Sequence, residues 1–325
     1  MQNTIIRSYC DLYTSQLSTD FIKLLKKFFR NYIVENDLHK LARLRLPDNE
    51  FLQELKRIRQ RPLPGRESSE HTVEDVSEYR GSKRTSDVLG ILEMVEYDEI
   101  VKEATSNGGR YLDLGAHDGS ITLEVSDEFG FDKKNVYALD VKPTSKVVNE
   151  FDGVNLFYAD KFFYLVSFYQ VLHHVRDLRL LEDVSRCTKP GGYLIIREHN
   201  KPNNDDNGAF LKLVELEHAI YDVVILEDYD TYNEFIDSYF ARYKSKYEWS
   251  KILDNHGFKF VRNQDVRTPL PGLTKPGPNG KNTPMYRSEP TRHYYALYRK
   301  KKKFNPSSNK IVNDNGDDID FELTE

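Results

Sequence analysis

In Tyr111-Leu112-Asp113-Leu114-Gly115-Ala116-His117-Asp118-Gly119-Ser120, a short apolar run ends in a glycine-containing turn, and a helical pattern then begins. Gly115 lets the chain turn tightly, and Gly119 allows a ligand or the helix to approach the backbone closely. From this point short apolar runs alternate with helical patterns, which is typical of a parallel sheet covered by helices. The sequence therefore predicts an α/β fold.

Seven apolar runs have the length expected of strands in such a sheet. They are residues 110–114, 135–139, 156–159, 164–168, 192–196, 258–262 and 294–299. Between the last two runs, residues 269–290 contain six of the 13 prolines. The prolines predict a long loop there, which in a compact domain is usually a functional flap or a disordered excursion.

The segment before this domain is predicted to be helical. Apolar residues from Phe21 to Tyr32 recur at the three-and-four spacing of an amphipathic helix, a second helix is predicted over residues 51–58, and Asp87 caps a third. The predicted organisation is a basic helical region over residues 1–62, a linker over 63–86, the α/β domain over 87–303, and an acidic disordered tail over 304–325.

Charge is distributed unevenly along the 325 residues. The formal net charge is -5, but residues 314–325 contain six acidic residues and no basic one. Residues 23–66 contain twelve Lys and Arg against five Asp and Glu. Such a basic block favours contact with a polyanion such as nucleic acid, while a solvated helix face is the simpler explanation.

Several classes of protein are excluded by composition. No stretch approaches the roughly 20 apolar residues of a membrane helix, and the N-terminus lacks the pattern of a secretory signal. Only Cys10 and Cys187 occur, which excludes a disulfide framework and a cysteine-based zinc site. We expect a soluble cytoplasmic protein with no membrane contact and no metal site.

Three aspartates lie at the ends of predicted strands and suit an unusual cofactor. Asp140 stands 21 residues after Gly119, where a carboxylate accepts hydrogen bonds from a ribose diol. Asp160 could accept a hydrogen bond from an adenine amino group. Asp113 adds a carboxylate that would repel a pyrophosphate but suits a cationic ligand. S-adenosylmethionine, with its ammonium, sulfonium and adenosine groups, matches all three.

Five motifs in the same order resemble class I S-adenosylmethionine-dependent methyltransferases. They are Asp113-Leu114-Gly115-Ala116-His117-Asp118-Gly119, Leu139-Asp140, Ala159-Asp160, Gln170-Val171-Leu172-His173-His174-Val175 and Lys189-Pro190-Gly191-Gly192-Tyr193-Leu194. The resemblance implies a Rossmann-like seven-stranded sheet with its last strand antiparallel. It implies a cofactor site made of Asp113, Gly115, His117, Asp118, Gly119, Asp140, Asp160 and Gln170, with Asp113 and Gly115 at the methionine part, Asp140 at the ribose and Asp160 at the adenine.

A narrower resemblance concerns the methyl acceptor. Three segments look like a group of FtsJ-like RNA methyltransferases of large cytoplasmic DNA viruses: Arg197-Glu198-His199, a downstream helix with Glu217-His218 and Tyr221, and the stretch from Tyr243 to Trp249. Tyr79-Arg80-Gly81-Ser82-Lys83 is similar to the element with which FtsJ-type enzymes begin. This implies RNA methylation at the mRNA cap region, Lys83, Arg197, Glu198 and His199 as catalytic residues, and a location in host cytoplasm or virion. Because a guanidinium cannot act as a base, Arg197 leaves both ribose 2'-oxygen and base nitrogen open as the methylated atom.

Two other classes of function stay open at this point. The Leu172-His173-His174-Val175 motif also occurs in enzymes that methylate small molecules, so a small-molecule or protein acceptor is an alternative. The incomplete match to the FtsJ catalytic set leaves a catalytically inactive RNA-binding subunit as another. The N-terminal helical region could also bind a protein partner.

Overall fold

The computed structural model describes residues 8–64, 97–106, 108–202, 208–276, 282–302, 311–312 and 318–319. The chain forms two compact units, the first made of Met1–Glu78 and Lys201–Phe240, and the second of Tyr79–Asn200 and Ala241–Glu325. The predicted domain over residues 87–303 includes Lys201–Phe240, which the structure groups with the N-terminal helices. We describe each unit by itself.

The second unit contains a mixed sheet of seven strands among the described residues, which confirms the predicted α/β fold. The strands are β1 (Tyr111–Leu114), β2 (Val136–Asp140), β3 (Asn149–Glu150), β4 (Phe163–Tyr169), β5 (Thr188–His199), β6 (Phe258–Pro276) and β7 (Asn282–Lys300). Their order is β3-β2-β1-β4-β5-β7-β6. Strands β1 to β5 are parallel, and β7 is antiparallel to both of its neighbours. The carboxyl ends of the five parallel strands therefore share one edge.

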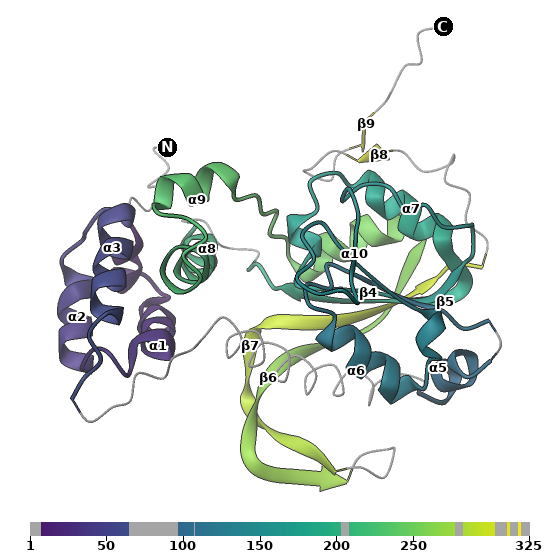
Figure 1. The fold of residues 1–325 in the computed structure, drawn as a ribbon, viewed down its shortest axis with the longest axis horizontal. Helices are drawn as coiled ribbons and strands as arrows, with labels where there is room; N and C mark the ends of the chain where they lie inside the picture. The colour runs from purple at the N-terminus through teal and green to yellow at the C-terminus, as the bar shows by residue number, and fades with distance from the viewer. Residues whose placement is uncertain are drawn as a thin grey trace, which may run out of the picture. The chain divides into compact units, whose positions relative to one another are not determined.

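Helices cover both faces of this sheet (Figure 1). One face packs against α7 (Arg179–Cys187) and α10 (Lys246–Asn255), and the other against α5 (Tyr97–Ala104) and α6 (Ser120–Phe129). All seven residues of β4 are buried, as expected of a central strand with helices on both sides. Trp249 of α10 is fully buried in the first of these layers.

Two short helical elements of this unit are η2 (Lys133–Asn135) and η3 (Leu172–His174), and η2 starts where the Asp132 carboxylate accepts from the Lys134 amide. The N-terminus of α10 has a capping box, in which the Ser245 hydroxyl accepts from the Glu248 amide and the Glu248 carboxylate accepts from the Ser245 amide. These reciprocal bonds satisfy donors that a helix N-terminus leaves open.

The prediction of a long loop over residues 269–290 is wrong for the described part of that range. Strand β6 continues to Pro276 and β7 begins at Asn282, so the two form a ribbon that extends away from the sheet (Figure 1). The prolines are tolerated because the ladder is irregular, with register shifts between Arg267 and Pro269 and between Pro269 and Thr274. Residues 277–281 lie outside the described residues.

The predicted strand over residues 156–159 is also wrong. These residues form no strand, and β3 lies earlier, where Asn149 and Glu150 pair with Leu139 and Asp140 of β2. The 156–159 backbone is held instead by Arg186, whose guanidinium donates to the carbonyl oxygens of Leu156 and Tyr158. The other six predicted strands are confirmed, although the boundaries of β5, β6 and β7 lie further out.

The first unit confirms a helical N-terminal region and adds a second segment to it. Its elements are η1 (Tyr9–Thr14), α1 (Ser18–Phe29), α2 (Glu35–Arg43), α3 (Asp48–Arg59), α8 (Ala209–Ala219), the π-helical η4 (Ile220–Ile225) and α9 (Tyr232–Ser238). Apolar residues from both segments share one core, which contains Phe21, Phe51, Leu213 and Val223.

A polar cluster in this unit joins the two segments. The Lys212 ammonium contacts Asp48 and lies 3.0 Å from a carboxylate oxygen of Glu215. The hydroxyls of Tyr9 and Tyr232 donate to the same glutamate at 3.1 and 2.7 Å. Since Lys212 and Asp48 are mostly buried, these contacts tie α8 firmly to the N-terminal helices.

Many cations of the basic N-terminal segment have partners within this unit. Lys27 pairs with Glu217, Lys56 donates to the carbonyl oxygens of Tyr229 and Asp230, and Arg59 donates to that of Val224. The partner segment, residues 201–240, contains ten acidic residues and two lysines. The basic block at residues 23–66 is therefore largely compensated by acidic and carbonyl groups of the same unit.

Some predicted features lie mainly outside the described residues. They include the Asp87 cap, most of the 63–86 linker and most of the 304–325 tail, in which β8 (Ile311–Val312) pairs with β9 (Asp318–Ile319). None of the described helices combines the length and apolar character needed to cross a bilayer.

Candidate functional site

The turn after β1 has the strained backbone that its glycines predict. Gly115 and Gly119 have φ angles of 75° and 79°, and His117 between them has a φ of 54°. A Cβ at Gly115 would lie 2.3 Å from a methyl carbon of Val171, so only glycine fits there. The Asp118 carboxylate accepts from the Ser120 amide at 3.0 Å and stabilises the start of α6. The turn therefore presents a fixed backbone at the carboxyl end of β1.

Asp113 is buried beneath this turn. One carboxylate oxygen accepts from the Thr122 hydroxyl and the other from the Ser167 hydroxyl, each at 2.7 Å. The side chain is about 1% exposed. Ser167 in turn lies 2.8 Å from the Tyr111 hydroxyl. Asp113 thus ties β1 to α6 and β4, and its place in the structure is that of a support for the turn.

Asp140 stands at the end of β2, next to the same turn. Its carboxylate accepts from the amides of His117 and Lys142, each at 2.9 Å. The side chain is partly exposed, so the carboxylate keeps a side open to a ligand. The structure brings Asp140 to the glycine turn, as the sequence predicts for a ribose-binding carboxylate.

Asp152 is a candidate that sequence reasoning missed. It follows β3 at the same sheet edge and is exposed. Its carboxylate accepts from the amides of Val154 and Asn155 at 2.8 and 2.7 Å, and these bonds hold its pKa below the usual value. A two-residue strand leaves no alternating pattern to detect, and the available signal was the Asp-Gly turn sequence at residues 152–153.

Asp160 lies apart from these residues. It precedes β4, at the amino end of the parallel strands, and its carboxylate pairs with Arg186 at 2.9 Å. The carboxyl ends that carry Gly115 and Asp140 are at the opposite edge. The structure does not bring Asp160 to the other predicted cofactor residues, because the strand expected just before it is absent.

Gln170 and Arg197 meet where β4 and β5 end. Gln170 has a φ of 59°, and its side-chain oxygen accepts from the Arg197 guanidinium at 2.8 Å. The Gln170 amide donates to the Arg197 carbonyl oxygen, also at 2.8 Å. The Arg197 guanidinium lies 5.7 Å from the centre of the Tyr295 ring. Arg197 is 5% exposed, within β5 rather than in a loop beyond it.

Glu198 is fully buried and paired with His173 of η3. Its Oε2 lies 2.6 Å from His173 Nδ1, and its Oε1 accepts from the His173 amide at 3.3 Å. Burial raises the pKa of Glu198 to about 8 and lowers that of His173 to about 3. Both effects favour the uncharged forms, so the two side chains hold a single shared proton at neutral pH.

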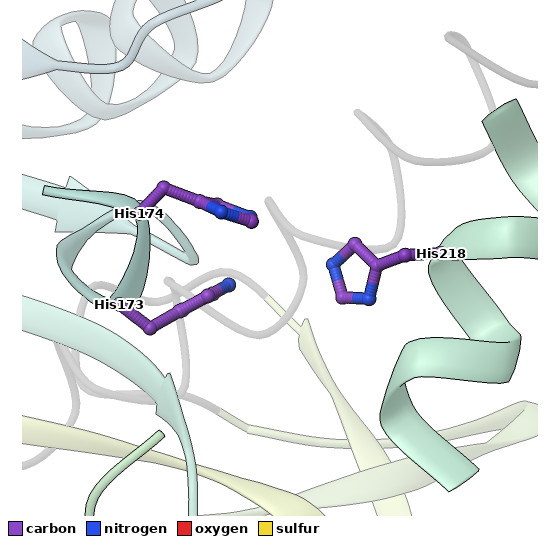
Figure 2. Close-up of side chains that lie close together, drawn as sticks. All are labelled: His173, His174 and His218. Atoms are coloured by element: carbon purple, nitrogen blue, oxygen red, sulfur yellow. The ribbon is translucent and has the colours of Figure 1, made fainter. Parts of the chain in front are cut away.

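Aromatic rings surround this pair. Figure 2 shows His173 and His174 extending side by side from η3, and their ring centres are 4.1 Å apart. Tyr243 stacks on His173 at 4.9 Å, and His199, at the end of β5, lies 5.0 Å from it. His218, also drawn in Figure 2, belongs to α8 of the other unit, where its Nδ1 lies 2.9 Å from the Val214 carbonyl oxygen.

The carboxyl ends of β1 to β5 thus contribute to one edge of the sheet. One predicted catalytic residue, Lys83, lies outside the described residues. Lys83 falls among residues 65–96, of which the structure describes nothing. At the edge itself, the carboxylate of Asp140 is partly exposed and that of Asp152 is exposed. Both are hydrogen-bond acceptors, which suits them to a ribose diol and an adenine amino group. The residues present therefore fit an adenosine-containing, phosphate-free cofactor.

Comparison with known proteins shows the family of this domain. A family model described as "Methyltransferase domain" matches residues 91–263, more than half of the chain. No curated protein sequence matches. Among solved structures, the chain is similar to a SAM-dependent methyltransferase from Aquifex aeolicus, with 17% identity, coverage of 67% of this chain and 96% of that one, and a TM-score of 0.35. It is also similar to one from Methanosarcina mazei, with 16% identity, coverage of 63% and 98%, and a TM-score of 0.38. The chain belongs to the methyltransferase domain family and is an enzyme that uses S-adenosyl-L-methionine.

Proposed function

We propose that this methyltransferase transfers the methyl group to RNA. The observation that carries the proposal is the β6–β7 ribbon. Strand β5 pairs with β7 only as far as His293, so the ribbon beyond that residue leaves the sheet at the carboxyl edge. The part of the ribbon beyond that residue, 266–276 of β6 and 282–292 of β7, contains four Lys and Arg against one Glu. A cationic ribbon beside the reaction edge suits a phosphate backbone.

The cofactor site in this proposal is the edge described above. The Gly115–Gly119 turn would hold the methionine part against its backbone, with Asp113 supporting the turn and His117 and Asp118 shaping it. Asp140 would accept from the ribose hydroxyls. Asp152 would accept from the adenine amino group, the role that the sequence assigned to Asp160. When bound, S-adenosyl-L-methionine supplies a methyl group activated by a sulfonium.

The residues at the ends of β4 and β5 would hold the acceptor. Arg197, fixed by Gln170, keeps its proton and can orient a phosphate or hydroxyl. Glu198 is committed to His173, which leaves His199 as the side chain of this strand end proposed to take the acceptor's proton. Alignment of the reacting atoms would supply much of the acceleration, up to about 7–11 kcal/mol in well-oriented reactions.

The test is methyl transfer from labelled cofactor to capped and uncapped RNA, followed by mass spectrometry of the nucleosides. We expect one modified nucleoside, and its identity decides between ribose oxygen and base nitrogen. Arg267→Glu, in the ribbon, should weaken RNA binding and lower its salt dependence by about one unit of slope. Lys23→Glu, on α1, serves as the matched control. Cofactor binding without transfer to either RNA would overturn the RNA acceptor.

A further inference from the structure

The pair formed by Glu198 and His173 is a fully buried polar contact of the second unit. The side chains are 1% and 0% exposed, and two contacts join them, at 2.6 Å between side chains and 3.3 Å from the His173 amide. The two residues come from different elements, since Glu198 lies in β5 and His173 in η3. The pair therefore fastens the segment that follows β4 to the neighbouring strand.

A second pair of contacts fastens the same segment three residues earlier. Gln170 exchanges two hydrogen bonds with Arg197, one through its amide and one through its side chain. Between these attachment points lies Val171. Residues 170–173 are therefore held against the end of β5 at both ends, and Val171 has little freedom to move.

Val171 packs directly on the cofactor turn. Its methyl carbons lie 2.3 and 2.5 Å from where a Cβ at Gly115 would be, so the side chain fills the space beside Gly115. A shift of Val171 toward the turn would meet the Gly115 backbone, and a shift away would remove its support. The position of this segment thus sets the shape of the turn.

We infer that Glu198 and His173 are a positioning pair for the cofactor turn, acting through the segment from Gln170 to His173. The pair touches no reacting atom, because both side chains are buried. The inference rests on the proposed place of the cofactor at the Gly115–Gly119 turn and not on the identity of the acceptor. It assigns Glu198 a role different from the catalytic one that the sequence predicts.

The shared proton gives this role a pH dependence. If the pair loses its proton, a buried carboxylate lies beside a neutral imidazole, a costly state that the chain can relieve by opening the segment to water. The titratable and charged side chains near the pair in this unit are His174, His199, Arg242, Tyr243 and Tyr294. We therefore expect cofactor affinity to fall above pH 8.

The experiment is calorimetric binding of S-adenosyl-L-methionine, without acceptor, from pH 6.5 to 9. Wild-type Kd should rise several-fold above pH 8, while Glu198→Gln, which keeps the hydrogen bond to His173 but cannot ionise, should show only the smaller change that titration of the cofactor's own ammonium group gives to both proteins. His173→Ala should raise Kd at least tenfold at pH 7. His256→Ala, at the C-cap of α10, is the control and should leave Kd unchanged.

Three outcomes would overturn the inference. The first is a Kd equal to that of the wild type in His173→Ala protein whose thermal melting shows that it is folded. The second is a wild-type Kd that does not change with pH. The third is a pH dependence of Kd in Glu198→Gln that follows the wild type. If His173→Ala does not fold, the Glu198→Gln profile still decides. Because no acceptor is present, failure of the RNA proposal leaves these results unchanged.

Discussion

Replacement of Glu198 by glutamine should change how the stability of the protein depends on pH. Glutamine matches glutamate in shape and can donate to His173 Nδ1, so the 2.6 Å contact is kept while the titrating proton is lost. The substitution therefore isolates the proton of the pair from its packing. The glutamine nitrogen cannot accept from the His199 amide, which donates to the same oxygen at 3.3 Å, so the substitution also removes that bond at every pH.

The size of this change in stability follows from the pKa values of Glu198 and His173. For Glu198 the pKa rises from 4.5 to about 8, so the stability it contributes is present below pH 4.5 and is lost as the pH rises to 8. For His173 the pKa falls from 6.5 to about 3, so its contribution is present above pH 6.5 and is lost as the pH falls to 3. The two slopes cancel between pH 4.5 and 6.5. From pH 6.5 to 8 the native pair holds one more proton than the unfolded chain, which costs about 2 kcal/mol.

The assay is the free energy of unfolding, from urea titrations at half-unit steps between pH 6 and 8.5. Wild-type stability should fall by about 2 kcal/mol relative to Glu198→Gln between pH 6.5 and 8, because only the wild type binds one more proton in the native than in the unfolded state. Glu124→Gln, at an exposed position of α6, should run parallel to the wild type. Parallel curves for the wild type and Glu198→Gln over this range would refute the shared proton.

Three further predictions concern the cofactor turn and the first unit. Gly115→Ala should lower cofactor affinity at least tenfold in equilibrium binding, because the new Cβ meets Val171 and the φ of 75° strains alanine. Asp140→Ala should weaken binding about tenfold in the same assay, whereas Asp160→Ala should leave it unchanged. Lys212→Met should destabilise the protein by about 3 kcal/mol in urea unfolding, because it leaves buried carboxylates without their cation.

The sheet was predictable because its strands carry strong local signals. Strands β1 and β4 are mostly apolar runs that are buried along their whole length, and the glycine turn after β1 marks where a strand changes to a helix. Strand β3 was not predictable, since a strand of two residues has no periodicity. The ribbon of β6 and β7 was misread because prolines usually end strands, and the bulges that tolerate them depend on pairing across the hairpin.

The site was predictable where a strand end fixes the position of a residue. Asp140 follows β2 directly, so its neighbourhood follows from the topology of parallel strands. The pairing of Glu198 with His173 was not predictable, although the sequence drew attention to both residues. A carboxylate at a strand end can point to a ligand or back into the core. For Glu198 this depends on how η3 packs against the end of β5, which the local sequence pattern does not determine.

The positions of the basic residues indicate which part of the protein would bind RNA. The sequence suggests contact through the basic residues 23–66, yet Lys27, Lys56 and Arg59 are engaged by residues 201–240 of their own unit. Cations that are already paired within the protein neutralise few phosphates. They therefore release few counterions from the RNA and add little to its affinity. Residues 266–276 and 282–292, the part of β6 and β7 that extends past the end of β5, contain four Lys and Arg against one Glu. The ribbon, rather than the N-terminal helices, is therefore the element whose charge should control RNA binding.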